Sequence, residues 1–157
     1  MKTDKFLIAI IGGIILLVII AMALVLARGQ NEAYVADDTP AGVTQNYFLA
    51  VQHKDYERAY GYLADDLKSK PDLDQFIRDM SNVRSEASLK IGETRPGTTT
   101  TQVDVSITTY SGGGIFESNS YTSEETVVLR AAPDGQWKLT SFPYPYWGYD
   151  WDQEKND

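Results

Sequence analysis

The sequence predicts an α+β fold in which an apolar amino-terminal helix precedes three further helices and four antiparallel strands. Three observations predict it: an uncharged apolar run over residues 6–27, apolar residues at helical spacing over 40–83, and apolar residues that alternate with polar ones over 87–142. A spacing of three or four residues is typical of an amphipathic helix, and alternation is typical of a half-buried strand. Because the helical segments come before the strands, we expect helices to cover one face of the sheet.

Residues 6–27 are expected to form a transmembrane helix. The 22 residues of this segment carry no charge, and at about 1.5 Å each they extend roughly 33 Å, against about 30 Å for a hydrocarbon core. A cleaved signal usually has a shorter apolar core. The one small-residue pattern, Ala21-Met22-Ala23, is also followed by further apolar residues. We therefore expect an uncleaved anchor, with the lipid bilayer as its partner.

Basic residues near the two ends of this segment predict its orientation. Lys2 and Lys5 precede it, and Arg28 follows it. Positively charged flanks tend to stay in the cytoplasm. We expect a single-pass protein of the cell membrane with residues 1–5 in the cytoplasm and the carboxyl-terminal domain outside.

Charge and composition exclude several classes of function. The chain has 14 basic and 22 acidic residues, and residues 29–157 hold 11 and 21 of them, a net charge of −10. Such a domain repels nucleic-acid phosphates, so no nucleic-acid partner is expected. The absence of cysteine removes disulfides, thiolate catalysis and cysteine-ligated metals. No metal site and no cofactor are expected, because the adjacent acids Asp65-Asp66 and Glu124-Glu125 point in different directions.

The segment after the apolar run divides into three parts. Residues 28–38 have no apolar period and are expected to be a linker. Residues 39–142 carry the periodic segments and are expected to form the folded domain. Residues 143–157 are an aromatic and acidic tail.

Capping residues mark the start of each expected helix in the folded domain. Thr39 precedes a proline at the first helical position, Asp55 follows a short break, and Asp72 has Gln75 three residues later. These are typical amino-terminal caps. The apolar residues that follow them predict helices over 40–52, 56–63 and 73–83.

Alternation and turn residues predict the four strands. Apolar residues alternate over 87–91 and 102–108, and further strands are expected over 124–132 and 137–142. The connecting segments contain Arg95-Pro96-Gly97, a run of three glycines over 112–114, and Pro133-Asp134-Gly135, which are turn formers.

Several of these residues resemble a known superfamily. Tyr47-Phe48 and Lys54-Asp55-Tyr56 are similar to the opening helices of the nuclear transport factor two-like superfamily, a cystatin-like cone, and the segment 127–139 is similar to its last hairpin. More narrowly, the chain resembles the lumazine-binding-like and unknown-function domains that bacteria hold behind one membrane helix. The resemblance spans about residues 39–142. It implies a strongly curved sheet wrapped around the long helix, with a pocket at the open end of the cone.

Enzymes with this fold, such as ketosteroid isomerases, polyketide cyclases and dehydratases, need an acid or base inside the cone. The one histidine, His53, falls in a break between helices and is expected to be a polar linker residue. Asp104 alternates with Val103 and Val105 and therefore lies on the face opposite to theirs. If that face meets solvent, Asp104 is an ordinary surface acid, and if it is the concave face, Asp104 is the one plausible base. No catalytic residue is assigned, and Asp104 is the alternative.

The aromatic run after the last strand is the most unusual feature of the sequence. Residues 142–151 hold six of the 18 aromatic residues of the chain, and bare aromatic surface is rare in monomers. The favoured interpretation is that the run folds back and closes the cone. Alternatively, it binds a partner, or it stacks on a cell-wall glycan beside Asp150 and Asp152. The candidate ligand- or partner-binding residues are Tyr144, Tyr146, Trp147, Tyr149 and Trp151.

The sequence thus predicts a membrane-anchored extracytoplasmic domain with a non-catalytic role in ligand binding or protein interaction at the cell envelope. The expected partner is an envelope protein or a second copy of the chain. The alternative is a small isomerase or dehydratase that acts on an apolar molecule with Asp104 as base. A third interpretation is an accessory module of cell-wall synthesis, because similar domains precede some transpeptidases.

Overall fold

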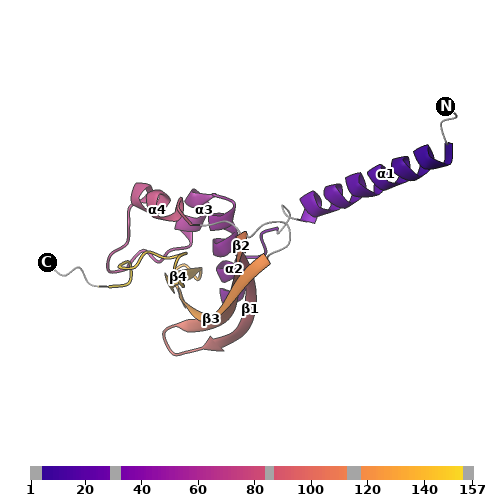
Figure 1. Cartoon of the computed structure of the whole chain (residues 1–157). Helices are drawn as coiled ribbons and strands as arrows, with labels where there is room; N and C mark the ends of the chain where they lie inside the picture. Colours follow the sequence, from indigo (N-terminus) through magenta and orange to yellow (C-terminus); the bar gives the residue numbers. More distant parts are fainter. Residues whose placement is uncertain (1–4, 29–32, 84–86, 113–117, 154–157) are drawn as a thin grey trace. The chain divides into compact units, whose positions relative to one another are not determined.

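The structure is a computed structural model that describes residues 5–28, 33–83, 87–112 and 118–153. The chain divides into two compact units, Met1–Ala33 and Tyr34–Asp157, whose elements are labelled in Figure 1.

The first unit contains one helix, α1 (Lys5–Arg28). Its described side chains, from Ile10 to Met22, are exposed all around the helix. No helix in the described part of the chain combines the length and the apolar character needed to cross a membrane. The transmembrane helix expected over residues 6–27 is therefore not supported by the structure. The side chains of residues 6–9 and 23–27 lie outside the described residues.

The second unit begins with three helices, α2 (Pro40–Gln52), α3 (Tyr56–Gly61) and α4 (Leu73–Met80). Each starts where the sequence predicts, because each cap binds a free backbone N–H of the first turn. The Thr39 hydroxyl accepts from Gly42 N at 3.0 Å, and the carboxylates of Asp55 and Asp72 accept from Arg58 N at 3.4 Å and Gln75 N at 2.7 Å.

The helix α3 ends earlier than predicted. The backbone of Tyr62 and Ala64 bonds instead to Leu139 near the end of the chain: Leu139 N donates to Tyr62 O at 2.8 Å, and Ala64 N donates to Leu139 O at 2.9 Å. Leu63 and Leu139 thereby form an isolated parallel bridge. The backbone groups that would continue the helix are used by the sheet.

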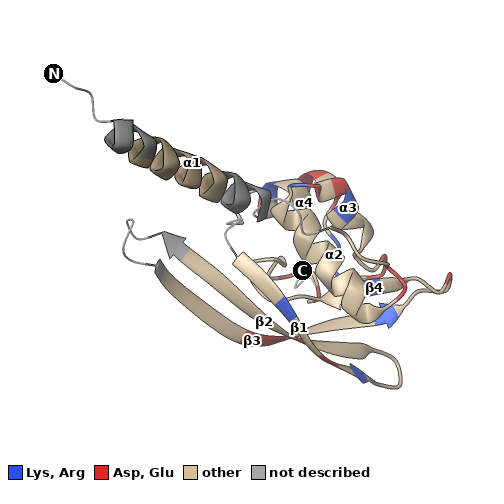
Figure 2. Cartoon of the chain, turned by 90° about the vertical axis from the view of Figure 1, so that its right-hand side faces the viewer, with Lys and Arg blue, Asp and Glu red and all other residues tan. Residues whose placement is uncertain are grey.

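Four strands follow the helices, as predicted: β1 (Ala87–Pro96), β2 (Thr101–Gly112), β3 (Ser118–Ala131) and β4 (Trp137–Ser141). They pair antiparallel in the order β1-β2-β3-β4. In β1, Gly92 and Glu93 both lie opposite Asp104, because the register shifts between Ile91 and Thr94. A bulge of this kind bends a strand and increases its twist, and Figures 1 and 2 show the sheet curving around α2.

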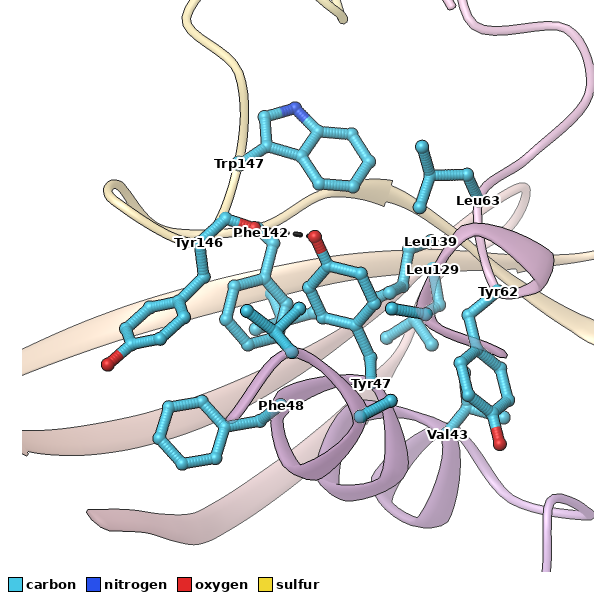
Figure 3. Close-up of a cluster of buried hydrophobic side chains, with 14 of the residues drawn as sticks. Val43, Tyr47, Phe48, Tyr62, Leu63, Leu129, Leu139, Phe142, Tyr146 and Trp147 are labelled. Atoms are coloured by element: carbon cyan, nitrogen blue, oxygen red, sulfur yellow. Dashed lines mark hydrogen bonds between the residues drawn. The ribbon is translucent and has the colours of Figure 1, made fainter. Parts of the chain in front are cut away.

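One side of the sheet, α2 and the carboxyl-terminal segment enclose the core. Val103, Val105 and Ile107 of β2 face inward and are buried, while the residues between them face the other side. Tyr47 of α2 lies at the centre, and its hydroxyl donates to the carbonyl of Tyr146 at 2.6 Å (Figure 3). The other large buried side chains around it include Phe48, Leu63, Phe76, Leu129, Leu139, Phe142, Trp147 and Trp151.

The folded unit also includes residues just before α2. The side chain of Asn46 is fully buried and pairs with the backbone of Val35, accepting from Val35 N at 2.9 Å and donating to Val35 O at 2.7 Å. A Cβ on Gly42 would come within 2.2 Å of Ala36 O, so glycine allows this close approach. The segment after Ala33 is therefore fixed to α2.

Candidate functional site

A groove runs along the carboxyl-terminal segment at the end of α4. Its volume is about 640 Å³. Three parts of the chain form it: α4 with the residues after it, Thr109 of β2, and the segment 144–150. The lining side chains with polar atoms or aromatic rings are those of Gln75, Asp79, Asn82, Thr109, Tyr144, Tyr146, Trp147, Tyr149 and Asp150.

The floor of the groove is buried. Met80, Tyr146 and Trp147 are between 2% and 5% exposed. The ring of Tyr146 lies 4.8 Å from that of Phe48 between centroids, and burial raises the pKa of the Tyr146 hydroxyl above its ordinary value. The floor therefore belongs to the core and presents uncharged groups to a ligand.

The rim of the groove carries two almost bare tyrosine rings. Tyr144 is 83% exposed and Tyr149 is 86% exposed. A second groove, of about 520 Å³, shares both residues with the first, so the two rings stand between two hollows. Tyr121 is also exposed, and it pairs directly with Thr109 across the β2–β3 ladder, which places both side chains on the same face of the sheet.

The segment that carries these rings is held in place by its own tryptophans. The ring of Trp151 lies 5.1 Å from that of Trp147 and 5.4 Å from that of Phe76. The backbone carbonyl of Trp151 accepts from Ser69 N at 3.2 Å, and Ser69 Oγ donates to Gln153 O at 2.9 Å. The carboxyl-terminal segment is thus packed into the fold, and these contacts hold the backbone that carries Tyr144 and Tyr149.

The structure divides the five candidate residues of the tail into two groups. Tyr146, Trp147 and Trp151 are in the core, as the self-packing interpretation expects, and only Tyr144 and Tyr149 offer most of their surface to a ligand. Residues 154–157 of the predicted tail lie outside the described residues. The groove therefore contains candidates of both groups, some as floor and some as rim.

Asp104 lies on the outer face of the sheet, opposite to the buried valines. Its carboxylate pairs with the guanidinium of Arg95 and accepts from the Thr126 hydroxyl at 3.2 Å. Further along this face, Ser106 Oγ donates to Glu124 at 2.7 Å. This is the arrangement of an ordinary surface acid, so the expectation of Asp104 as a base inside the cone does not agree with its position.

A second polar cluster lies where the segment before α2 meets α3. Arg58 stacks 3.6 Å above the centre of the Tyr34 ring, and its Nε donates to the Tyr62 hydroxyl at 3.2 Å. That hydroxyl also donates to Asp37 at 3.0 Å. Burial is the main cause that raises the pKa of Tyr62. The exposed ring of His53 meets Tyr34 edge-on at 6.1 Å. These groups satisfy one another, and the cluster fastens the segment before α2.

Sequence reasoning did not identify the polar side chains of the groove. The sequence marks Gln75 only as the residue three positions after the cap Asp72 and does not single out Asp79 or Asn82, and only the tertiary fold brings the three into one groove with Tyr149. Within the described residues, no group of three or more histidine, aspartate or glutamate side chains is arranged to hold a metal ion.

No protein-family model and no curated protein sequence matches this chain. Solved structures match it in fold. A SEC-C motif-containing protein from Rhodopseudomonas palustris matches with a TM-score of 0.50 and 17% identity, over 67% of this chain and 77% of that one. A proposed ketosteroid isomerase from Shewanella frigidimarina matches with a TM-score of 0.48 and 18% identity, over 68% and 95%. A proposed dehydratase of the nuclear transport factor two-like family from Streptomyces avermitilis matches with a TM-score of 0.43 and 17% identity, over 62% and 86%. Identities this low show a likeness of fold alone.

Proposed function

We propose that this protein is a membrane-anchored, non-catalytic binding module with a nuclear transport factor two-like fold, which holds a partner at the cell envelope in the groove beside Tyr144 and Tyr149. The observation that carries the proposal is the pair of exposed tyrosine rings that line a groove of about 640 Å³. Aromatic side chains with this much exposure are typical of interaction sites.

The order and packing of the elements support the superfamily part of the proposal. Three short helices precede a four-stranded antiparallel sheet that curves around the longest of them. The narrower assignment, to the membrane-anchored lumazine-binding-like and unknown-function subgroup, rests on the sequence resemblance and on the apolar segment 6–27.

The filled interior supports a non-catalytic role. The space between α2 and the sheet is occupied by Tyr47, Phe142 and Trp147, which are at most 5% exposed, and Figure 3 shows these rings packed together. A general base must reach the proton that it abstracts. Asp104 faces away from this interior, and His53 is exposed at the end of α2.

The surface of α1 supports the membrane part of the proposal. The described large apolar side chains between Ile10 and Met22 are 44% to 68% exposed. A helix that is apolar all around needs an apolar environment on every side, which a bilayer supplies. The orientation follows from Lys2 and Lys5 before the helix and Arg28 after it. The partner is accordingly an envelope protein or a second copy of this chain.

Crosslinking followed by affinity capture tests the binding role. The full chain is expressed in cells of its source organism, and the proteins that are crosslinked to it are captured. They are compared with the proteins captured by the double variant Tyr144→Ala, Tyr149→Ala. We expect the variant to lose the partner. Tyr110→Ala is the control, because Tyr110 lies on the outer face of the sheet and bonds Ser88 there at 3.4 Å. Equal recovery of every captured protein by the groove variant and the control would contradict the proposal.

A further inference from the structure

The charges around the groove carry an inference about the chemistry of its ligand. Asp79 and Asp150 are the charged side chains that line it, and both are exposed. Among the lining residues that the structure describes there is no lysine or arginine, and in the same part of the chain neither carboxylate forms an ion pair. A phosphate or an acidic sugar would meet only repulsion from these two groups.

The same pair of groups, a carboxylate and a tyrosine ring, holds a cation elsewhere in this fold. Lys70 Nζ lies 2.7 Å from the carboxylate of Asp65 and 4.9 Å from the centre of the Tyr60 ring. A cation within about 6 Å of a ring face is attracted by it, and the attraction adds to the charge interaction. A carboxylate and an aromatic ring from two different side chains thus hold the same ammonium group.

An arginine of α3 is held in a comparable way. The Arg58 guanidinium lies 3.6 Å from the centre of the Tyr34 ring, and it donates to a tyrosine hydroxyl that is itself bonded to Asp37. In both places the tyrosine and the carboxylate come from this chain, and so does the cation. The groove presents the tyrosine and the carboxylate, as Tyr149 next to Asp150, to the solvent.

We propose that the groove binds a lysine- or arginine-bearing segment of a partner polypeptide, with the cationic groups between the carboxylates of Asp79 and Asp150 and the rings of Tyr144 and Tyr149. The inference rests on the proposed function and deepens it. A volume of about 640 Å³ far exceeds one ammonium group, which favours a short segment over an isolated ion. The net charge of −8 also attracts a cationic segment over long range and speeds its encounter.

Binding of a defined peptide to the full chain in detergent tests the proposal. The probe is an acetylated and amidated peptide of alternating glycine and lysine, eight residues long, and its matched controls replace every lysine with glutamine or glutamate. Amide chemical shifts report where the peptide binds. We expect the lysine peptide to perturb residues 144–150 and the end of α4. The affinity should fall at least tenfold between 50 and 500 mM salt, because exposed charges are screened.

Charge variants separate the groove from the general acidity of the protein. Asp79→Asn with Asp150→Asn should weaken the lysine peptide about five- to tenfold, as expected for two exposed ion pairs. Asp74→Asn is the control, because Asp74 is an exposed acid of α4 that does not line the groove. Tyr149→Ala should weaken binding by a similar factor, whereas Tyr149→Phe should retain it, since the ring face and not the hydroxyl attracts the cation.

Three outcomes would overturn the inference. The first is no perturbation of the groove by the lysine peptide at millimolar concentration. The second is an equal effect of the groove variants and Asp74→Asn. The third is perturbation of the groove by an uncharged N-acetylglucosamine hexamer, or by self-association, and not by the lysine peptide. In that third case the proposed binding role stands and the ligand chemistry is wrong. The binding role itself is refuted if the crosslinking experiment recovers the same proteins with the groove variant and with the control.

Discussion

At the scale of single residues, Tyr47 joins the first helix of the folded unit to the carboxyl-terminal segment. Its hydroxyl donates to Tyr146 O at 2.6 Å, and the side chain is fully buried. Tyr47→Phe keeps the ring and removes the donor, which leaves a buried carbonyl without its partner. We expect the free energy of unfolding to fall by about 1–2 kcal/mol, measured by urea denaturation at pH 7.

The same variant carries a prediction about alkaline pH. Burial raises the pKa of Tyr47 above its ordinary value of 10.0, so above pH 10 the unfolded chain loses this proton while the folded chain keeps it. The contribution to stability is therefore complete below pH 10 and is lost as the pH rises further. The stability of the wild type should fall between pH 10 and 11.5 more steeply than that of Tyr47→Phe, by up to about 1.4 kcal/mol per pH unit. Equal slopes would contradict this account.

Gly148 tests how tightly the carboxyl-terminal segment is packed. A Cβ at this position would lie 2.1 Å from Trp151 Nε1, so Gly148→Ala requires the Trp151 ring to move within the core. Such overpacking costs about 1–3 kcal/mol. Gly61→Ala at the end of α3 is the control, because nothing lies within 4 Å of its added Cβ. Thermal unfolding should show a lower Tm for Gly148→Ala alone, and equal Tm values would contradict the packing.

At the scale of elements, the residues before α2 are part of the fold through Asn46. Its amide pairs with both backbone groups of Val35, as a neighbouring strand would. Asn46→Ala should lower the free energy of unfolding by about 2 kcal/mol, because it leaves these groups unpaired. Hydrogen exchange at Val35 N should quicken in parallel. Asn119→Ala, at an exposed position of β3, should change neither quantity, and an unchanged exchange rate in Asn46→Ala would contradict the role of Asn46.

Local signals in the sequence suffice for the starts of the three helices of the folded unit and fail where a distant residue decides. The caps Thr39, Asp55 and Asp72 act within three residues, so the helix starts could be predicted. The end of α3 could not, because the backbone around Leu63 bonds to Leu139. The strand β3 begins at Ser118, whereas the sequence predicts a start near residue 124. The earlier start could not be predicted, because the residues from Ser118 to Ser123 contain no alternating apolar side chains.

The candidate site shows the same limit. The sequence singles out Tyr144 and Tyr149 because they belong to a segment that is unusually rich in aromatic residues. The sequence does not predict that Asp79 and Asn82 line a groove, since polar residues on and after a short helix are ordinary surface residues. Their place beside Asp150 depends on how Trp151 packs against Phe76, a contact between residues 75 positions apart.

At the scale of the whole molecule, the chain combines an exposed apolar helix with an acidic folded unit. The acidic unit has no reason to adsorb to anionic headgroups, so the membrane attachment proposed above would depend on α1 alone. We expect the full chain to remain with the membrane pellet after an alkaline carbonate wash. Charged residues in the middle of a membrane helix cost about 2.5–3.5 kcal/mol each. The variant Ile14→Lys, Leu17→Lys should therefore appear in the soluble fraction.

The control for this prediction keeps the apolar character of α1. Ile14→Leu with Leu17→Ile changes the same two exposed positions without adding charge, and it should stay in the pellet. Protease added to intact cells should then cleave the folded unit and spare residues 1–5, because the basic residues Lys2 and Lys5 predict an amino terminus in the cytoplasm. Release of the wild type by carbonate would contradict a membrane-spanning α1. The partner of the groove would then not have to be a protein of the cell envelope.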